Sequence, residues 1–203
     1  MEDRKYNVLA SPELVEEAIR SLKNNGIQAV LVNTAQEAKE KVLESIPQGS
    51  EVFTMTSVTL EACGLTEEIN ESGKLRSVRD QLSKETDENT KRKLGAAPDW
   101  AVGSVQAVSQ DGKVLVVSNT GSQLPAYAYG GGKVIWVVGT QKIVKDFDEG
   151  LERIYEYVLP LESERAKKAY GVPGSNVSKL LVINKEVNPE RLMIIFVNEV
   201  LGY

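Results

Sequence analysis

The chain has 203 residues, of which 41% are hydrophobic and 26% are charged, and its net charge at pH 7 is -5. This balance is typical of a soluble globular protein, and the acidic charge argues against a nucleic-acid partner. The sequence contains no histidine, which excludes imidazole bases and serine–histidine triads. The single cysteine, Cys63, is too few for an iron–sulfur cluster, so we expect no metal and no cofactor.

The first ten residues, MEDRKYNVLA, are charged and polar and contain no apolar run of signal-peptide length. No stretch of the sequence approaches the roughly 20 apolar residues that cross a bilayer. A lone cysteine also fits a reducing compartment. We therefore expect a cytoplasmic protein with no membrane partner, folded as one domain over residues 1–203.

Helix and strand patterns alternate in the first half of the chain. Ser11-Pro12 predicts a helix start, and apolar residues at helical spacing continue until Gly26. A second helix is predicted at Thr34, where Thr34 and Glu37 form a capping box. Strands are predicted on either side of this helix, at residues 27–32 and 51–55. A short helical segment, a weak strand and a polar helix then follow, at residues 60–71, 75–78 and 83–94. This alternation predicts parallel strands with right-handed crossovers.

The second half of the chain is richer in strands. Two β-favouring runs flank Asp111-Gly112, a dipeptide that predicts an antiparallel hairpin. Asp146 predicts the start of a long helix, which Pro160 is expected to kink. Further strands are predicted at residues 133–139, 179–184 and 191–197, and the last of them is expected to be buried. Together the patterns predict an α/β protein with three layers, whose mainly parallel sheet includes the antiparallel hairpin.

Hydroxyl side chains follow the strand predicted at residues 51–55, where a helix begins. Ligands of open α/β sheets bind at the carboxyl ends of strands, and a helix start offers free N–H groups to an anion. Thr56, Ser57 and Thr59 are therefore candidates for binding a phosphate or carboxylate. The alternative is that Thr56 or Ser57 only caps the helix.

A polar, glycine-rich segment separates two strongly apolar runs at residues 119–132. Its length of about a dozen residues is unusual for a plain connection between strands. We expect it to line a small-molecule pocket, whereas the alternative is a set of turn residues with positive φ. The candidate binding residues in this segment are Asn119, Thr120, Gly121, Ser122 and Gly131.

Lys142 follows the strand predicted at residues 133–139 and is the candidate cation for an anionic ligand. The alternative is an ordinary solvated lysine. Cys63 is expected to be a buried structural thiol. Glu162 and Arg165 are expected to form an ion pair on a helix face, although Arg165 has the length to reach a ligand carboxylate. The aromatic residues Tyr127, Tyr129 and Trp136 are expected to pack the loop and the core.

Three long segments resemble the LUD domain family, which includes lactate utilization protein C. They are FTMTSVTLEACGL, DWAVGSVQAVSQDGKVLVVSNTGSQLPAYAYGGGKVIWVVGTQKIV and LERIYEYVLPLESERAKKAYG, and the resemblance extends over about residues 11–203. It implies a fold of the ribose-5-phosphate isomerase and CoA transferase type. It also implies a role in oxidising lactate, as a subunit without a redox centre beside partner subunits that carry iron–sulfur clusters. The alternative is a stand-alone binder or sensor of a small anionic metabolite, such as a sugar phosphate or an acyl-CoA.

CoA transferases of this fold type carry a nucleophilic glutamate in a Ser-Glu-Asn-Gly turn. The comparable turn here is Ser118-Asn119-Thr120-Gly121, with Asn119 at the position of that carboxylate. An amide is a poor nucleophile, so we expect no covalent CoA intermediate. Asn119 retains the ability to hydrogen-bond a ligand. Whether the chain is an enzyme stays open on these grounds.

Overall fold

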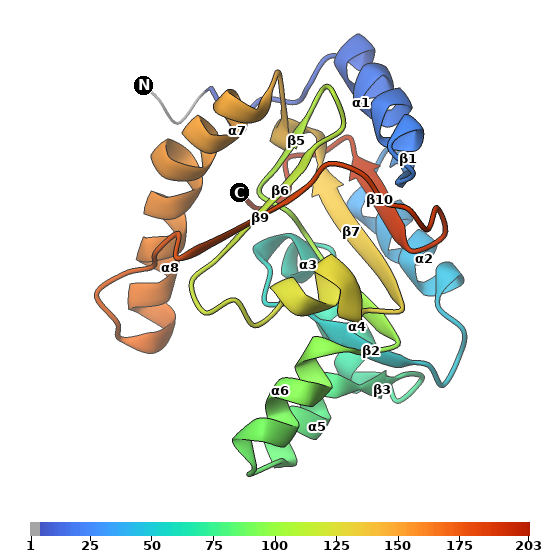
Figure 1. The fold of residues 1–203 in the computed structure, drawn as a ribbon, viewed down its shortest axis with the longest axis vertical. Helices are drawn as coiled ribbons and strands as arrows, with labels where there is room; N and C mark the ends of the chain where they lie inside the picture. The colour runs from blue at the N-terminus through green and yellow to red at the C-terminus, as the bar shows by residue number, and fades with distance from the viewer. Residues whose placement is uncertain (1–4) are drawn as a thin grey trace.

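The computed structural model describes residues 5–203, so the first four residues of the polar N-terminal segment lie outside the described part. Its centre is a six-stranded sheet in the order β1-β10-β7-β4-β2-β3, in which all neighbouring strands are parallel (Figure 1). The two central strands, β7 and β10, are nearly continuous runs of Val, Ile and other apolar residues, because both faces of a parallel sheet are covered. The strands are β1 (Gln28–Val32), β2 (Glu51–Thr54), β3 (Arg76–Ser77), β4 (Trp100–Gly103), β7 (Lys133–Gly139) and β10 (Leu192–Val197).

Helices cover one face of this sheet. The apolar sides of α2 (Ala35–Ser45), α3 (Val58–Ala62) and α4 (Leu65–Glu71) form one core cluster with strand residues such as Ile135 and Ile195. Thr34 caps α2 as its sequence predicts, because its Oγ1 accepts a hydrogen bond from the Glu37 N–H at 3.1 Å. These three helices therefore form one helical layer of an α/β fold.

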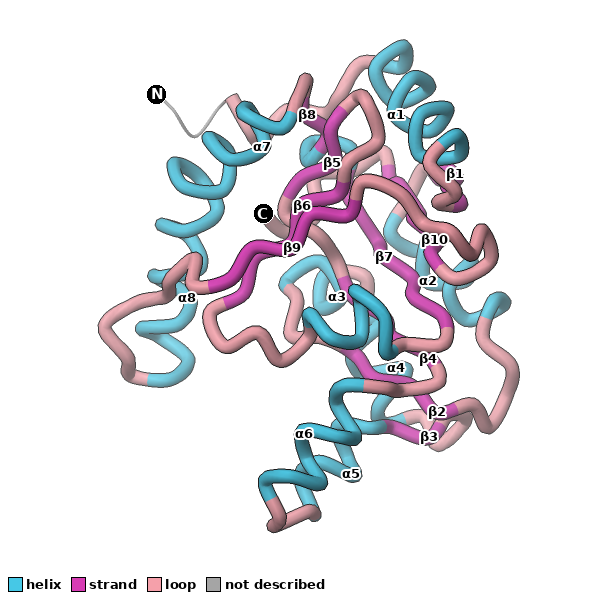
Figure 2. Tube along the Cα trace, viewed as in Figure 1, coloured by secondary structure: helices cyan, strands magenta, loops and turns pink. Residues whose placement is uncertain are grey.

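The opposite face is covered by α1 (Pro12–Asn24) and by a second sheet. This sheet has the order β8-β5-β6-β9, and Figure 2 shows β9 running alongside β6 at its edge. Its strands are β5 (Ala107–Ser109), β6 (Val114–Ser118), β8 (Ile143–Val144) and β9 (Lys179–Ile183). α7 (Phe147–Arg153) packs on its outer side. The three-layer α/β prediction is confirmed, but the hairpin belongs to this separate sheet and not to the parallel one.

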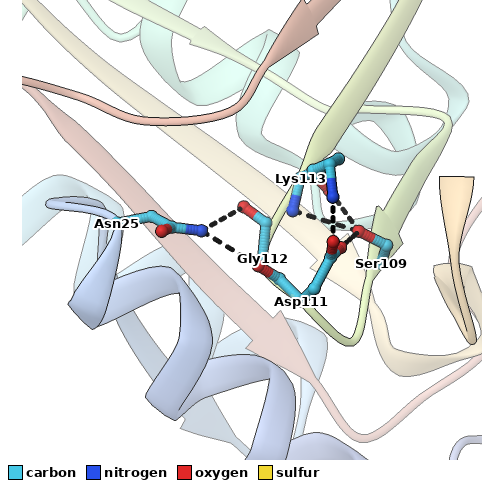
Figure 3. A network of polar contacts seen from close by, with 5 residues as sticks. All are labelled: Asn25, Ser109, Asp111, Gly112 and Lys113. Atoms are coloured by element: carbon cyan, nitrogen blue, oxygen red, sulfur yellow. Dashed lines mark hydrogen bonds and ion pairs between the residues drawn. The ribbon is translucent and has the colours of Figure 1, made fainter.

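The hairpin forms at Asp111-Gly112 as predicted, with β5 and β6 antiparallel and Gly112 at φ +80°. Asp111 contacts both Ser109 and Lys113, and the Lys113 N–H donates to Ser109 Oγ at 3.0 Å (Figure 3). Asn25, at the end of α1, donates to the carbonyl oxygen of Asp111 at 3.0 Å. The turn is thus held locally and also joined to the first helix.

Two helix predictions need correction. The polar helix predicted at residues 83–94 is two helices, α5 (Val78–Lys84) and α6 (Glu88–Ala96), which project together away from the sheets in Figure 1. They separate because Glu85 Oε1 accepts from the N–H groups of Thr86 and Asp87, and Asp87 then caps α6. Pro160 lies in the first turn of α8 (Leu159–Tyr170), directly after a π-helical turn at Ile154–Val158, so the helical irregularity precedes the proline. Within residues 5–203, no helix is both long and apolar enough to span a bilayer.

Candidate functional site

A cavity of about 420 Å³ opens at the carboxyl ends of three neighbouring strands of the parallel sheet. Its floor is made by the segments that directly follow β2, β4 and β7, at residues 55–59, 104–106 and 142. The end of β6 and the loop after it form one wall, and the π-helical turn and α8 form another. This position is where open α/β sheets bind ligands, and the volume suits a small molecule.

Lys142 reaches the cavity from a 3-10 turn after β7, and its side chain is buried, with a relative exposure of 2%. Its Nζ donates to Thr59 Oγ1 at 3.0 Å and to Ser104 Oγ at 3.2 Å. Burial, and then the charge of Arg153, hold the pKa of the Lys142 amine well below its ordinary value. The alternative of a solvated surface lysine is therefore wrong.

Thr59 connects Lys142 to the carboxyl-terminal segment. Its hydroxyl donates to the carbonyl oxygen of Leu201 at 3.1 Å. Gly202 follows at φ +59°, and a Cβ on it would lie 2.5 Å from Thr59 Oγ1. Glycine therefore allows the chain end to close against Thr59, which fixes the hydroxyl that holds Lys142.

Arg153 lies near Lys142 and is fully buried. Its guanidinium carbon lies 5.9 Å from the Tyr6 ring and 5.3 Å from the Tyr157 ring, and its Nη1 donates to the carbonyl oxygen of Gln106. Burial lowers the pKa of Arg153 to about 10. In the described part of the chain its Nε and Nη2 have no hydrogen-bond partner. Two aromatic faces thus hold a positive charge just behind the cavity floor at Gln106.

Arg79 is a cavity residue that the sequence patterns did not reveal. It stands in the first turn of α5, and its Nε donates to the Thr54 carbonyl at 2.6 Å while its Nη2 donates to Thr56 Oγ1 at 2.8 Å. None of the ion pairs found within residues 5–203 includes Arg79. Burial lowers its pKa, but an arginine stays protonated in proteins, so a positive charge without an ion-pair partner lines the cavity.

The hydroxyl side chains of Thr56, Ser57 and Thr59, which follow β2, either cap a helix or bind one of these cations. Ser57 caps α3, because its Oγ accepts from the Leu60 N–H at 3.4 Å. The alternative that one of these hydroxyls caps the helix is therefore correct for Ser57. Thr56 binds Arg79, and Thr59 binds Lys142. The hydroxyls thus hold basic side chains at the cavity, and any contact of theirs with an anion stays a prediction.

α8 contributes a second arginine. Arg165 and Glu162 form the expected ion pair, with Nε and Oε2 2.7 Å apart, and both residues also line the cavity. The Tyr203 hydroxyl donates to Glu162 Oε2 at 2.8 Å, so Tyr203 lines the cavity beside α8. Burial raises the pKa of Glu162, but the hydrogen bonds from Arg165 and Tyr203 outweigh it and leave the pKa lowered.

The glycine-rich segment 119–132 has two different roles. Its first half lines the cavity, where Asn119 Oδ1 accepts from the Ser178 hydroxyl at 3.2 Å. Its triple glycine instead packs on backbone, because a Cβ on Gly130 would lie 1.9 Å from the Ala96 carbonyl oxygen. Tyr127 and Trp136 pack edge to face as expected, with ring centroids 5.2 Å apart. Tyr129 is 89% exposed, so its predicted packing role is wrong.

The structure brings together most of the residues predicted for the site. Those that line the cavity are Thr56, Ser57, Thr59, Asn119, Thr120, Ser122 and Lys142. Gly121 and Gly131 are not part of the lining. Gly121 has a backbone φ of +87° and packs against the side chain of Lys179. Gly131 packs against the Ala126 carbonyl. Ligand binding by the lining residues stays a prediction.

Cys63 lies near this site and is buried, as expected. Burial and the charge of Glu199 raise the pKa of its thiol to about 11, against an opposing effect of Lys142. A thiol with such a pKa is protonated at neutral pH and a weak nucleophile. We therefore assign it no chemistry.

The family model described as LUD domain matches residues 15–197. A DUF162 family protein from Deinococcus radiodurans is similar over 94% of this chain and 100% of that chain, with 14% identity and a TM-score of 0.59. A search of curated proteins found no match.

Ribose-5-phosphate isomerases are also among the structural neighbours. The enzyme from Plasmodium falciparum is similar over 64% of this chain and 66% of that chain, with 14% identity and a TM-score of 0.34. A D-ribose-5-phosphate isomerase in complex with phospho-erythronic acid is similar over 83% of this chain and 96% of that chain, with 12% identity and a TM-score of 0.40. These two similarities are too low to support an argument about the site.

Proposed function

Because the chain belongs to the LUD domain family, we propose that it binds a small carboxylate- or phosphate-bearing metabolite in this cavity, as part of lactate or related hydroxy-acid utilisation. The LUD resemblance supports this metabolic setting. The cavity supports the ligand class. In this role the chain acts as a subunit that holds no redox centre of its own.

One observation carries the proposal, namely the positive charge of Arg79 in the cavity lining, which is part of no ion pair found within residues 5–203. Its hydrogen-bond partners are the Thr54 carbonyl oxygen and the Thr56 hydroxyl, which are both uncharged, so the planar guanidinium is held in place without an ion pair. Arginine binds carboxylate and phosphate well because its donors match their geometry. The buried Arg153 behind the cavity floor adds to the positive potential.

The proposed subunit role leaves electron transfer to partners. One cysteine and no histidine give this chain too few ligands for an iron–sulfur cluster. The resemblance to lactate utilization proteins supports partner subunits that carry such clusters. The alternative, a stand-alone sensor, needs the same cavity but no partner, so the ligand has to be identified first.

The experiment is a thermal-shift screen of hydroxy acids, oxo acids, sugar phosphates and acyl-CoAs at constant ionic strength. A ligand at about 100 times its Kd stabilises the folded state by about 2.7 kcal/mol, which for a chain of this size raises Tm by about 5–10 °C. We expect such a rise for at least one anion and none for its uncharged amide or ester. If no anion raises Tm above its uncharged analogue, the proposal is wrong.

A further inference from the structure

Lys142 differs from every other lysine in the described part of the chain, because it alone is buried. It lines the cavity, and its Nζ contacts are the hydroxyls of Thr59 and Ser104. No carboxylate forms an ion pair with it among residues 5–203. A buried lysine with no counter-ion is costly as a cation and is commonly found where an uncharged amine is used in chemistry.

We propose that Lys142 is a nucleophilic amine that forms an imine with the carbonyl group of a small oxo acid bound in the cavity. The inference rests on the proposed anion site, because the carboxylate of the oxo acid is held by Arg79. Thr56, which binds Arg79, and Thr59, which binds Lys142, are three residues apart on the same segment. Both side chains line the cavity, and the proposal assigns the acid group of the bound molecule to Arg79 and its carbonyl group to Lys142.

The hydrogen bonds around Nζ suit an uncharged amine. Thr59 directs its own hydrogen to the Leu201 carbonyl, so toward Lys142 its oxygen accepts. Ser104 accepts from Nζ at 3.2 Å and makes no other hydrogen bond that is found among the described residues, so its hydroxyl can rotate and donate to the nitrogen lone pair once the amine is uncharged. The lowered pKa of Lys142 agrees with this arrangement. A desolvated lysine amine is an established type of nucleophile toward carbonyl groups.

The reaction consumes no oxidant or reductant. The Lys142 nitrogen attacks the carbonyl carbon, so a C–N bond forms while the π electrons move to oxygen, and one amine proton moves to that oxygen. The carbinolamine then loses its hydroxyl with the second amine proton as water, while the nitrogen lone pair forms the C=N bond. The Ser104 hydroxyl, 3.2 Å from Nζ, is placed to pass these protons.

The test is reductive trapping on the full chain. The protein is incubated with pyruvate or glyoxylate, treated with borohydride, digested and mapped by mass spectrometry. We expect the reduced adduct on Lys142, at a level on the order of tenfold or more above the adduct on Lys145, which is 79% exposed. Wild-type mapping gives the answer even if a Lys142→Arg variant fails to fold. Where that variant folds, we expect the adduct to be lost, whereas a Lys145→Arg variant keeps it.

Thermal shifts with the same acids separate the two proposals. If pyruvate or glyoxylate raises Tm but leaves no adduct on Lys142, the imine is refuted and the anion site stands. Equal labelling of Lys142 and Lys145 also refutes the imine. If no adduct forms on Lys142 and no anion raises Tm, both proposals are refuted.

Discussion

The Nζ of Lys142 lies 3.0 Å from the Thr59 hydroxyl, which joins the end of β7 to the start of α3 beneath the cavity. The contact joins an amine that follows β7 to a hydroxyl in the helix that follows β2, and the two residues are 83 positions apart in the sequence. Folding therefore moves the Lys142 amine from water to a buried site. Because burial is the main cause of its lowered pKa, the contact links the stability of the fold to pH.

A Lys142→Met variant tests this link. The folded-state pKa is lowered from 10.5, so between the folded value and 10.5 the unfolded chain holds one more proton than the folded chain. Wild-type stability therefore rises with pH in this window, by up to about 1.4 kcal/mol per pH unit. We expect the stability of Lys142→Met relative to wild type to be highest at neutral pH and to fall toward pH 10.5, in urea titrations. Lys145→Met is the exposed control. A difference that does not change with pH would contradict the burial of an amine.

Gly103 and Tyr127 form a second testable contact beside the cavity. A Cβ on Gly103 would lie 1.8 Å from the Tyr127 hydroxyl oxygen. We expect Gly103→Ala to lower the free energy of unfolding by about 1–3 kcal/mol, which is usual for overpacking. The double variant with Tyr127→Phe should recover part of this loss, because the nearest remaining ring atom would be 3.0 Å away.

Gly95→Ala in α6 is the matched control for this pair. Its Cβ would lie 3.4 Å from the Phe53 ring, and alanine favours a helix, so we expect no loss of stability. If Gly103→Ala and Gly95→Ala have the same stability in urea titrations, the close approach of Tyr127 to β4 is wrong.

Cys63 is expected to be inert in the folded protein. It is buried, and its thiol has a pKa raised to about 11, so little thiolate forms at neutral pH. An aromatic disulfide reagent should label it slowly in buffer and rapidly in denaturant. Stoichiometric labelling of the native protein within the mixing time of the assay would mean that the thiol is accessible.

Local signals in the sequence were sufficient for much of the fold. Ser11 caps α1 and Asp111-Gly112 makes its hairpin because these features depend on neighbouring residues alone. The division of β4 from β5 was not predictable from the local pattern. Residues 100–109 form a single β-favouring run, but tertiary packing assigns its two ends to different sheets.

The site was predictable only where it follows a strand. Thr59 and Lys142 lie within about five residues of the ends of β2 and β7, so the rule for strand ends located them. Arg79 lies in a polar helix, and Arg165 comes from α8, whose position beside the strand ends is set by long-range packing. No spacing in the sequence indicates that these arginines share a cavity with Lys142.

The central claim is that Arg79 supplies charge to an anion site, and calorimetric titration of the best anion from the thermal screen tests it most directly. A charge-assisted contact is worth roughly 1.5–3 kcal/mol, so Arg79→Met should weaken binding about 10–100-fold. Arg76→Met is the matched control, because Arg76 is exposed, pairs with Asp99 and lies outside the cavity lining. Its affinity should stay within about twofold of wild type, as usual for a distant surface substitution. Equal affinity in wild type, Arg79→Met and Arg76→Met would contradict the account.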